Sequence, residues 1–228
     1  MLCLPVQHAT MPMPTLTIAD LLLEARRFAD LENMHNEPSL YGVNDGKAIG
    51  SYLERKFARM LALSYNLDTG NAASGIDLPG LNVDLKTTSV RQPQSSCPFR
   101  SARQKVYGLG YHLLVFVYAK SDDPARRTAC LAMRHVVFIE AGRTADFQMT
   151  SGLRQILANN GSVEDIVAFM LDRNLPVDEI GATSLAEEII ANPPAIGWLT
   201  ISNAQQWRLQ YQRALDNAHR GDGVVSIL

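Results

Sequence analysis

Residues 75–86 of the chain read Gly75-Ile76-Asp77-Leu78-Pro79-Gly80-Leu81-Asn82-Val83-Asp84-Leu85-Lys86. From Leu81 onward apolar and polar residues alternate, and a period of two sends alternate side chains to opposite faces of a strand. Asp84 and Lys86 therefore share a face. Pro79-Gly80 suits a tight turn, because proline fixes φ and glycine accepts positive φ. The stretch predicts a hairpin in which Asp77 faces Asn82 and lies diagonal to Asp84.

Two carboxylates on neighbouring strands need a counter-charge. At a separation of about 6 Å they repel by roughly 3 kcal/mol at an effective dielectric near 20. Such a pair takes up a proton or binds a cation. Two aspartates suit a hard cation such as Mg²⁺, which keeps several waters and accepts a phosphate oxygen as a further ligand. Lys86 has the charge needed to hold an anionic substrate or an attacking water.

Acidic-x-Lys triplets occur three times, so the triplet alone is not specific. They are Asp45-Gly46-Lys47, Glu54-Arg55-Lys56 and Asp84-Leu85-Lys86. The first lies in a glycine-bearing loop, and the second lies in a predicted helix, where residues i and i+2 do not share a face. Only the third lies on a predicted strand. The alternative for this third triplet is a solvated hairpin with ordinary surface charges.

The arrangement resembles that of the PD-(D/E)XK nuclease superfamily, in which an acidic residue precedes an Asp/Glu-x-Lys strand and a Glu lies on an earlier helix. The matching residues are Asp77, Asp84, Lys86 and Glu54. The chain departs from the pattern at Ile76, where the superfamily has proline, and in the short interval between its two aspartates. The resemblance implies an α/β fold with a mixed central sheet flanked by helices, which is a restriction-endonuclease-like core, and a C-terminal helical region.

The same resemblance implies an Mg²⁺-dependent type II restriction endonuclease that cleaves double-stranded DNA at a short specific sequence. Asp77 and Asp84 would hold the metal, and Glu54 would bind a second ion or orient the first. Lys86 would position the attacking water and stabilise charge on the phosphate. A homodimer is expected, since duplex targets of this kind are palindromic. The alternatives are a repair or junction-resolving nuclease of the same core and a DNA-binding protein with an inactive nuclease core.

The interval between Asp84 and Asp122 contains no acidic residue, although the formal net charge of the whole chain is −2. Such an interval indicates a local basic region. Basic and amide side chains supply the donors that phosphates and base edges require. The residues predicted to bind DNA are Arg91, Gln92, Gln94, Arg100, Arg103, Gln104 and Lys105. The alternative is a solvated loop with unpaired surface charges.

The composition is that of a globular protein, since 228 residues with 46% hydrophobic content can bury a full core. Three widely spaced cysteines without a Cys-x-x-Cys pair indicate neither a disulfide framework nor a zinc site, which fits a reducing cytoplasm. The five histidines have no ligand spacing. No apolar run reaches membrane-spanning length, and the N-terminus does not have the form of a signal peptide.

The chain is predicted to comprise a flexible N-terminus over 1–16, a nuclease core over 17–147 and a helical region over 148–228 packed on the core. In the core, Thr17 and Asp20 form a capping box that starts one helix, and a second helix covers about 46–64. Glu54 borders the apolar stripe of that second helix. The remaining expected elements of the core are a short helix over 101–107 and buried strands over 111–118 and 129–141.

Beyond Thr150 the pattern predicts helices only. Their expected ranges are 153–159, 162–174, 184–191 and 202–219. Trp198, Trp207 and Tyr211 are expected to pack this region onto the core, and the alternative is that an aromatic ring stacks on a base or wedges into DNA.

Overall fold

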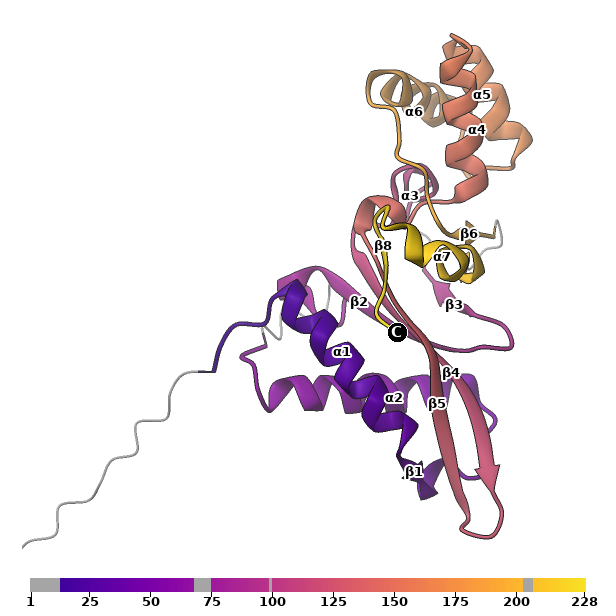
Figure 1. Ribbon diagram of the computed structural model, residues 1–228. Helices are drawn as coiled ribbons and strands as arrows, with labels where there is room; N and C mark the ends of the chain where they lie inside the picture. Colours follow the sequence, from indigo (N-terminus) through magenta and orange to yellow (C-terminus); the bar gives the residue numbers. More distant parts are fainter. Residues whose placement is uncertain (1–12, 68–74, 99, 203–206) are drawn as a thin grey trace, which may run out of the picture.

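The computed structural model describes residues 13–67, 75–98, 100–202 and 207–228. Its centre is a mixed sheet in the order β1-β5-β4-β2, with β8 also paired to β5 (Figure 1). β2 runs parallel to β4, whereas β4 and β5 form a long antiparallel hairpin. The strands of this sheet are β1 (Asn36–Glu37), β2 (Val83–Ser89), β4 (His112–Asp123), β5 (Thr128–Ile139) and β8 (Val224–Ser226). The predicted α/β fold with a mixed central sheet is confirmed.

Helices α1 (Ile18–Asn33) and α2 (Gly46–Ala62) cover one face of this sheet, as Figure 1 shows. The predicted capping box of α1 is present, because the Thr17 side chain accepts from the Asp20 amide and the Asp20 carboxylate accepts from the Thr17 amide. Phe28 of α1, Phe57 of α2 and Phe116 of β4 meet with ring centroids 5.1 to 5.5 Å apart. Such tilted and edge-on aromatic contacts pack both helices against the sheet.

A second, smaller sheet covers part of the opposite face. Its order is β3-β7-β6, and it consists of β3 (Gln94–Cys97), β7 (Trp207–Gln210) and β6 (Thr200–Ile201). Trp207 and Tyr211 are fully buried between this sheet and the central one, and Trp198 packs against the same cluster. The predicted packing role of these three aromatic residues is confirmed. The next helix, α7 (Gln212–Asn217), leads through η5 (Ala218–Arg220) to β8.

Three helices form a separate cluster that projects from the end of the central sheet, with the short helix α3 at its base (Figure 1). The four elements are α3 (Arg103–Tyr107), α4 (Phe147–Ala158), α5 (Val163–Asp172) and α6 (Glu179–Ala191). α5 begins at a capping box formed by Ser162 and Asp165, at the predicted start. None of the described helices combines the length and apolar character that a membrane span requires.

The predicted helix over 202–219 is wrong. The described part of this range holds β7, α7 and η5, while residues 203–206 lie outside the described residues. β7 pairs with β3, and β8 pairs with β5, so the end of the chain returns to both sheets. The boundary at residue 147 remains a prediction, and in the described residues beyond α6 short strands alternate with the short helices α7 and η5.

Three smaller differences concern the ends of elements. β4 continues to Asp123, beyond the predicted end at residue 118, and residues 124–127 form the loop to β5. The segment between α1 and α2, for which no element is predicted, contains β1 and the short helix η1 (Pro38–Leu40), and a further short helix, η4 (Ala141–Arg143), follows β5. In the predicted flexible N-terminus, residues 1–12 lie outside the described residues, whereas Leu16 is buried.

Candidate active site

Asp77 and Asp84 are brought together by one isolated bridge. The Leu78 amide donates to the Val83 carbonyl at 2.9 Å, and the Val83 amide donates back at 3.2 Å. Asp77 therefore directly precedes this bridged pair and Asp84 directly follows it. The predicted register, with Asp77 facing Asn82, is wrong. The connection is a short 3-10 helix, η3 (Pro79–Leu81), followed by Asn82 at φ 54°, and not a two-residue turn.

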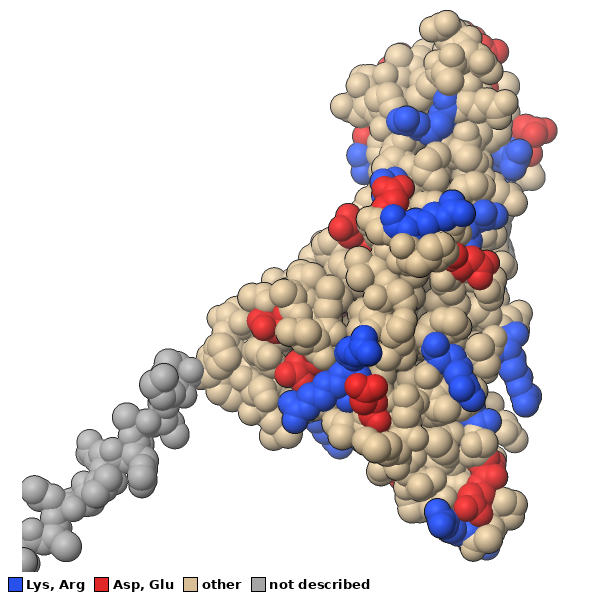
Figure 2. Space-filling model, viewed as in Figure 1, with Lys and Arg blue, Asp and Glu red and all other residues tan. Residues whose placement is uncertain are grey.

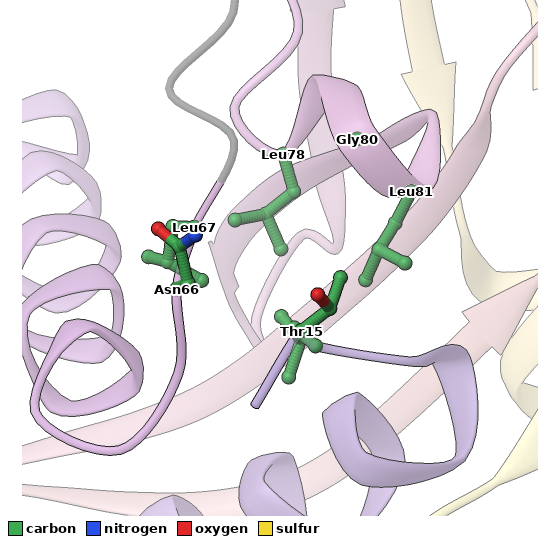
Figure 3. Close-up of a pocket in the computed structure, with 7 residues that line it drawn as sticks. Thr15, Asn66, Leu67, Leu78, Gly80 and Leu81 are labelled. Atoms are coloured by element: carbon green, nitrogen blue, oxygen red, sulfur yellow. The ribbon is translucent and has the colours of Figure 1, made fainter. Parts of the chain in front are cut away.

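The back of this turn packs on the N-terminal segment. Figure 3 shows Leu78 and Leu81 pointing toward Thr15 and Leu67 around a small hollow. The volume of the hollow is about 40 Å³. That volume holds a few waters at most. The side chains packed around the hollow therefore hold the turn that carries Asp77 in place, and the hollow itself is too small to bind a nucleotide.

Two carboxylates lie along the free edge of β2. In the described part of the chain β2 is the last strand of the central sheet, so the backbone N–H groups of alternate residues face away from β4. The Leu85 N–H donates to Asp77 Oδ2 at 2.9 Å. Further along the same edge, the Glu54 carboxylate from α2 lies against the backbone of Thr87. Asp77 and Glu54 thus reach the site from a turn and a helix, at the edge of the strand.

Lys86 and Asp84 share a face of β2, and Lys86 Nζ lies 2.6 Å from Asp84 Oδ2. This face is not the outward face that the hairpin pattern predicted. The Asp84 side chain is only 5% exposed and that of Lys86 is 22% exposed. The buried cluster that contains Tyr111 and Tyr211 lies close enough to Asp84 for its charge to affect both phenols. The second sheet and its aromatic residues cover this face.

The electrostatics of the site reflect a surplus of buried negative charge. Burial raises the pKa of Asp84 to about 6; the Lys86 ammonium opposes this shift and Asp77 adds to it. Burial and then the charge of Asp77 also raise the pKa of Glu54. Burial alone would lower the pKa of Lys86, but Asp84, Asp77 and Glu54 together raise it. One lysine therefore offsets three carboxylates only in part.

The chemistry of this donor set fits a hard divalent cation. Among the described residues, no three acidic, histidine or cysteine side chains already surround a common point as metal ligands do. Asp84 Oδ2 is paired with Lys86, and Asp77 Oδ2 accepts from the Leu85 amide. Carboxylate oxygens and excess negative charge are what Mg²⁺ requires. Binding of such an ion would have Asp84 exchange its lysine partner for the metal.

Glu54 and Lys86 line an open cleft of about 750 Å³. Its walls are the start of α2, the segment that follows β2, and the second sheet. A smaller hollow lined by Asp77 and Glu54 adjoins it. Apart from Glu54, the charged residues that line the cleft are all basic, namely Lys47, Lys86, Arg91 and Arg208. An anionic ligand in this cleft would lie among four cationic side chains from α2, β2, the segment after β2, and β7.

This basic lining is a local feature. Figure 2 shows acidic and basic side chains intermixed on the face in view, with much uncharged surface between them. The formal net charge of the whole chain is only −2, because acidic and basic residues are nearly equal in number. A cleft lined by one sign of charge can therefore attract an anionic polymer without a basic protein surface as a whole.

Comparison with known proteins decides the class of ligand. Residues 15–226 match the family described as type II restriction enzyme NspV. The type II restriction enzyme NspV of Nostoc sp. (strain ATCC 29411 / PCC 7524) is 58% identical over 215 residues, which cover 94% of this chain and 98% of that enzyme. The chain belongs to the NspV family of type II restriction enzymes. No solved structure matches the chain.

Membership of the NspV family confirms the predicted activity of a site-specific DNA endonuclease. It favours this activity over the two alternatives, a repair or junction-resolving nuclease and a DNA-binding protein with an inactive core. Type II restriction enzymes as a class use a divalent metal ion, in agreement with the three carboxylates of the site.

The predicted DNA-binding residues of this NspV-family enzyme lie in different settings. Arg91, Gln92 and Gln94 line the cleft. Thr88 holds the turn that carries the first two, because its hydroxyl donates toward the carbonyls of Gln92 and Gln94 and accepts from the Gln94 amide. The Arg100 guanidinium lies against the backbone near Asp77, 3.5 Å from the position of a Cβ added to Gly75.

The other three candidates lie in α3 and make contacts within the fold. Arg103 forms a bidentate ion pair with Glu188 of α6, with Nη2 2.6 Å from Oε1. Gln104 is buried, donates to the Leu109 carbonyl and accepts from the Arg100 amide. Lys105 is also buried, and burial lowers its pKa. The contacts of these residues hold the projecting helices to the core and leave the DNA-binding role to Arg91, Gln92, Gln94 and Arg100.

Two cleft residues of the NspV-family enzyme are absent from the sequence-based predictions. Lys47 belongs to the triplet at 45–47, which has no catalytic spacing but lies at the start of α2, facing the cleft. Arg208 falls in the range that was predicted as a helix. The alternation of Trp207, Leu209 and Tyr211 with polar residues is the period of a strand, and it is the signal that indicates Arg208 as a surface residue.

Proposed function

We propose that this enzyme hydrolyses phosphodiester bonds of double-stranded DNA at a short specific sequence in an Mg²⁺-dependent reaction. The observation that supports the assignment of the site is the convergence of Asp77, Asp84 and Glu54 around Lys86, which lines a basic cleft together with Glu54. Asp77 and Asp84 would hold the ion, and Glu54 would bind a second ion or orient the first.

The bound ion supplies Lewis acidity, which favours ionisation of a water and neutralises charge on the phosphate. In the metal-free site the neighbouring carboxylates raise the pKa of Lys86, which favours its ammonium form as a hydrogen-bond donor. With Asp84 as a ligand of the metal, the Lys86 ammonium would position the attacking water and stabilise charge on the phosphate. Asp84 must be ionised to serve as a ligand, so protons compete with the metal near the pKa of about 6.

The duplex would bind along the cleft. Lys47 and Arg91 line the same cleft as Lys86 and would contact phosphates. Gln92 and Gln94 follow Arg91 along the wall and supply neutral donors and acceptors. Arg100, next to the Asp77 turn, would contact a phosphate close to the scissile bond.

We further propose a cytoplasmic homodimer. A palindromic duplex site presents two equivalent scissile bonds, and each chain has one set of the four active-site residues. Sedimentation velocity should therefore give a particle of twice the 25.1 kDa chain mass without DNA, and a particle of that mass plus one duplex when DNA is bound. A species of single-chain mass under both conditions would contradict the dimer but not the active site.

Removal of divalent metal should abolish cleavage and lower thermal stability. Ligand at a hundred times its Kd stabilises a protein by about 2.7 kcal/mol, which corresponds to a rise of about 5–10 °C in Tm for a chain of this size. We expect plasmid cleavage with Mg²⁺ or Mn²⁺ and none in excess chelator, and a matching rise in Tm when Mg²⁺ or Ca²⁺ is added. Cleavage that persists in excess chelator would contradict the metal-dependent mechanism.

Arg91 and Arg103 form a matched pair for the position of the cleft. Both are exposed arginines of the acid-free interval, but only Arg91 lines the cleft, whereas Arg103 is paired with Glu188. Loss of one phosphate contact lowers the slope of log Kobs against log salt concentration by about one. Arg91→Ala should show this decrease in Ca²⁺ buffers, and Arg103→Ala should keep the wild-type slope. The reverse result would place the DNA on the α3 side.

A further inference from the structure

The second sheet, β3-β7-β6, has two faces of opposite character. One face is turned inward and consists of Cys97, Ile201, Trp207 and Leu209, together with Ser95, whose hydroxyl contacts that of Tyr211. The other consists entirely of polar side chains, namely Gln94, Ser96, Thr200, Arg208 and Gln210. The polar face has no carboxylate and no apolar side chain among these positions, so packing within the described chain does not account for it.

The strand register places these polar residues side by side. Gln94 is paired with Gln210, and Ser96 is paired with Arg208. Directly opposed residues of antiparallel strands project to the same face, about 5 Å apart. The side chains of Gln94, Arg208 and Gln210 make no hydrogen bond or ion pair within the described part of the chain. Two amides and a guanidinium are thus held next to each other with their hydrogen-bonding groups unused.

This face continues into the active site. Gln94, Ser96 and Arg208 line the same cleft as Glu54 and Lys86. DNA that brings a phosphate to Lys86 therefore passes over the polar face. The relevant occupant of the face is accordingly the duplex substrate and not a second protein.

The side-chain types favour contact with bases over contact with phosphates. A phosphate-binding surface carries several cations, whereas this face has one arginine among neutral groups. Arginine donates to O6 and N7 of guanine, and glutamine pairs with N6 and N7 of adenine. Three strands spaced by about 4.8 Å span about 10 Å, which a major groove about 12 Å wide admits.

We propose that the polar face of the β3-β7-β6 sheet reads base edges in the major groove, with Arg208 contacting a guanine and the Gln94–Gln210 pair contacting an adenine. This inference rests on the proposed active site and deepens it by naming the residues that select the sequence. Arg208 and Gln210 are specificity residues in this assignment, while Lys86 and the carboxylates carry out the chemistry.

The test uses the full-length enzyme and a pool of duplexes with a randomised window of about ten base pairs. Sequencing the cut ends in Mg²⁺ gives the recognition sequence of the wild type. Arg208→Lys retains the charge but loses the planar fork that binds guanine at two points. A good bidentate contact is worth about 1–3 kcal/mol, or roughly 5- to 150-fold in discrimination. Arg208→Lys should cleave the preferred sequence more slowly by that factor and should no longer prefer G·C at one position of the site.

Two further measurements separate base reading from charge and from misfolding. Binding of Arg208→Lys to an unrelated duplex in Ca²⁺ should keep the wild-type affinity within about twofold and the wild-type salt slope. Arg134→Lys is the matched control, because Arg134 is an exposed strand arginine that does not line the cleft, and it should cut as the wild type does. Gln210→Ala should in turn relax preference at an A·T pair while its Tm stays near the wild-type value.

Arg208→Lys that cuts the same sequence at the wild-type rate would overturn the proposal, as would an equal loss on every sequence, which would mark a phosphate contact. Failure of the proposed active site gives a different result. In that case the wild type leaves the pool uncut, or Asp84→Asn cuts it as well as the wild type does.

Discussion

Asp84→Asn should abolish detectable DNA cleavage, by at least about a thousandfold, while the metal-free protein keeps or gains thermal stability. The cleavage loss follows because asparagine supplies no negative charge to the metal or to the water that the metal activates. The gain in stability follows from the position of Asp84, which is buried beside a second aspartate, with a pKa raised to about 6. A pKa higher in the folded than in the unfolded state means that folding loses stability as pH rises between these values.

This mechanism predicts a specific dependence on pH and on metal. In chelator, the Tm of the wild type should fall relative to that of Asp84→Asn as the pH rises from about 4 to above 6, because only the wild type must then bury the Asp84 charge. Adding Ca²⁺ at pH 8 should raise the wild-type Tm by several degrees and the variant Tm by much less. Scanning fluorimetry over this pH range, with plasmid digestion in parallel, measures both effects.

Asp146→Asn is the matched control, because Asp146 is also a buried aspartate but serves the fold alone. Its Oδ1 accepts from the Met149 amide at 2.8 Å at the start of α4, and its Oδ2 accepts from the Ile201 amide at 2.7 Å. Replacing it puts an NH₂ group where an acceptor is needed, which costs about 1–3 kcal/mol. Asp146→Asn should therefore lower the Tm yet retain cleavage below it. If Asp84→Asn cleaved DNA at the wild-type rate, Asp84 would not be part of the active site.

The parts of the fold that depend on neighbouring residues could be predicted from the sequence. Thr17 and Ser162 start α1 and α5 as their capping patterns predict, since a cap is decided within four residues. The alternation around Asp84 and Lys86 predicts correctly that their side chains share a face. These features need no information from distant parts of the chain.

The geometry of the site could not be predicted in the same way, because distant segments decide it. Asp77 reaches the site because its carboxylate accepts a hydrogen bond from the Leu85 amide at the edge of β2. The position of Asp77 along β2 is determined by the four residues that connect Leu78 to Val83. The face of Asp84 is buried because β3 and β7 cover it, and β7 lies more than 120 residues later in the chain. No pattern local to Asp84 could predict that cover.

The position of Arg208 illustrates a signal that was present but competed with another. Residues 202–219 contain enough helix-forming residues to favour a helix when they are taken as one segment. Within it, Trp207, Leu209 and Tyr211 alternate with Arg208 and Gln210, and a helix would send these apolar residues to different faces. The strand forms because its alternation buries Trp207, Leu209 and Tyr211 together against the central sheet.

Lys86→Ala should reduce cleavage in Mg²⁺ by at least about a hundredfold, because one positioned cationic group next to the phosphate is lost. Most phosphate contacts lie elsewhere in the cleft, so binding of duplex DNA in Ca²⁺ should persist. A lysine on a solvent-exposed hairpin face would leave the Tm unchanged on replacement, but Lys86 forms a largely buried ion pair with Asp84. Without Lys86, the ionised Asp84 is left buried with no lysine to offset it. The metal-free Tm should fall, more at pH 8 than at pH 5, and Ca²⁺ should narrow the difference.

Lys56→Ala distinguishes the chemical role of Lys86 from its role in the fold. Lys56 Nζ also lies 2.6 Å from a buried carboxylate, that of Glu32, with side-chain exposures of 33% and 3%, close to the 22% and 5% of Lys86 and Asp84. The Lys56 pair is not part of the cleft lining. Lys56→Ala should therefore lower the Tm without loss of cleavage below it. If both lysine variants cut DNA at the wild-type rate, Lys86 has no part in the reaction, and if both lose cleavage equally, the loss reflects stability alone.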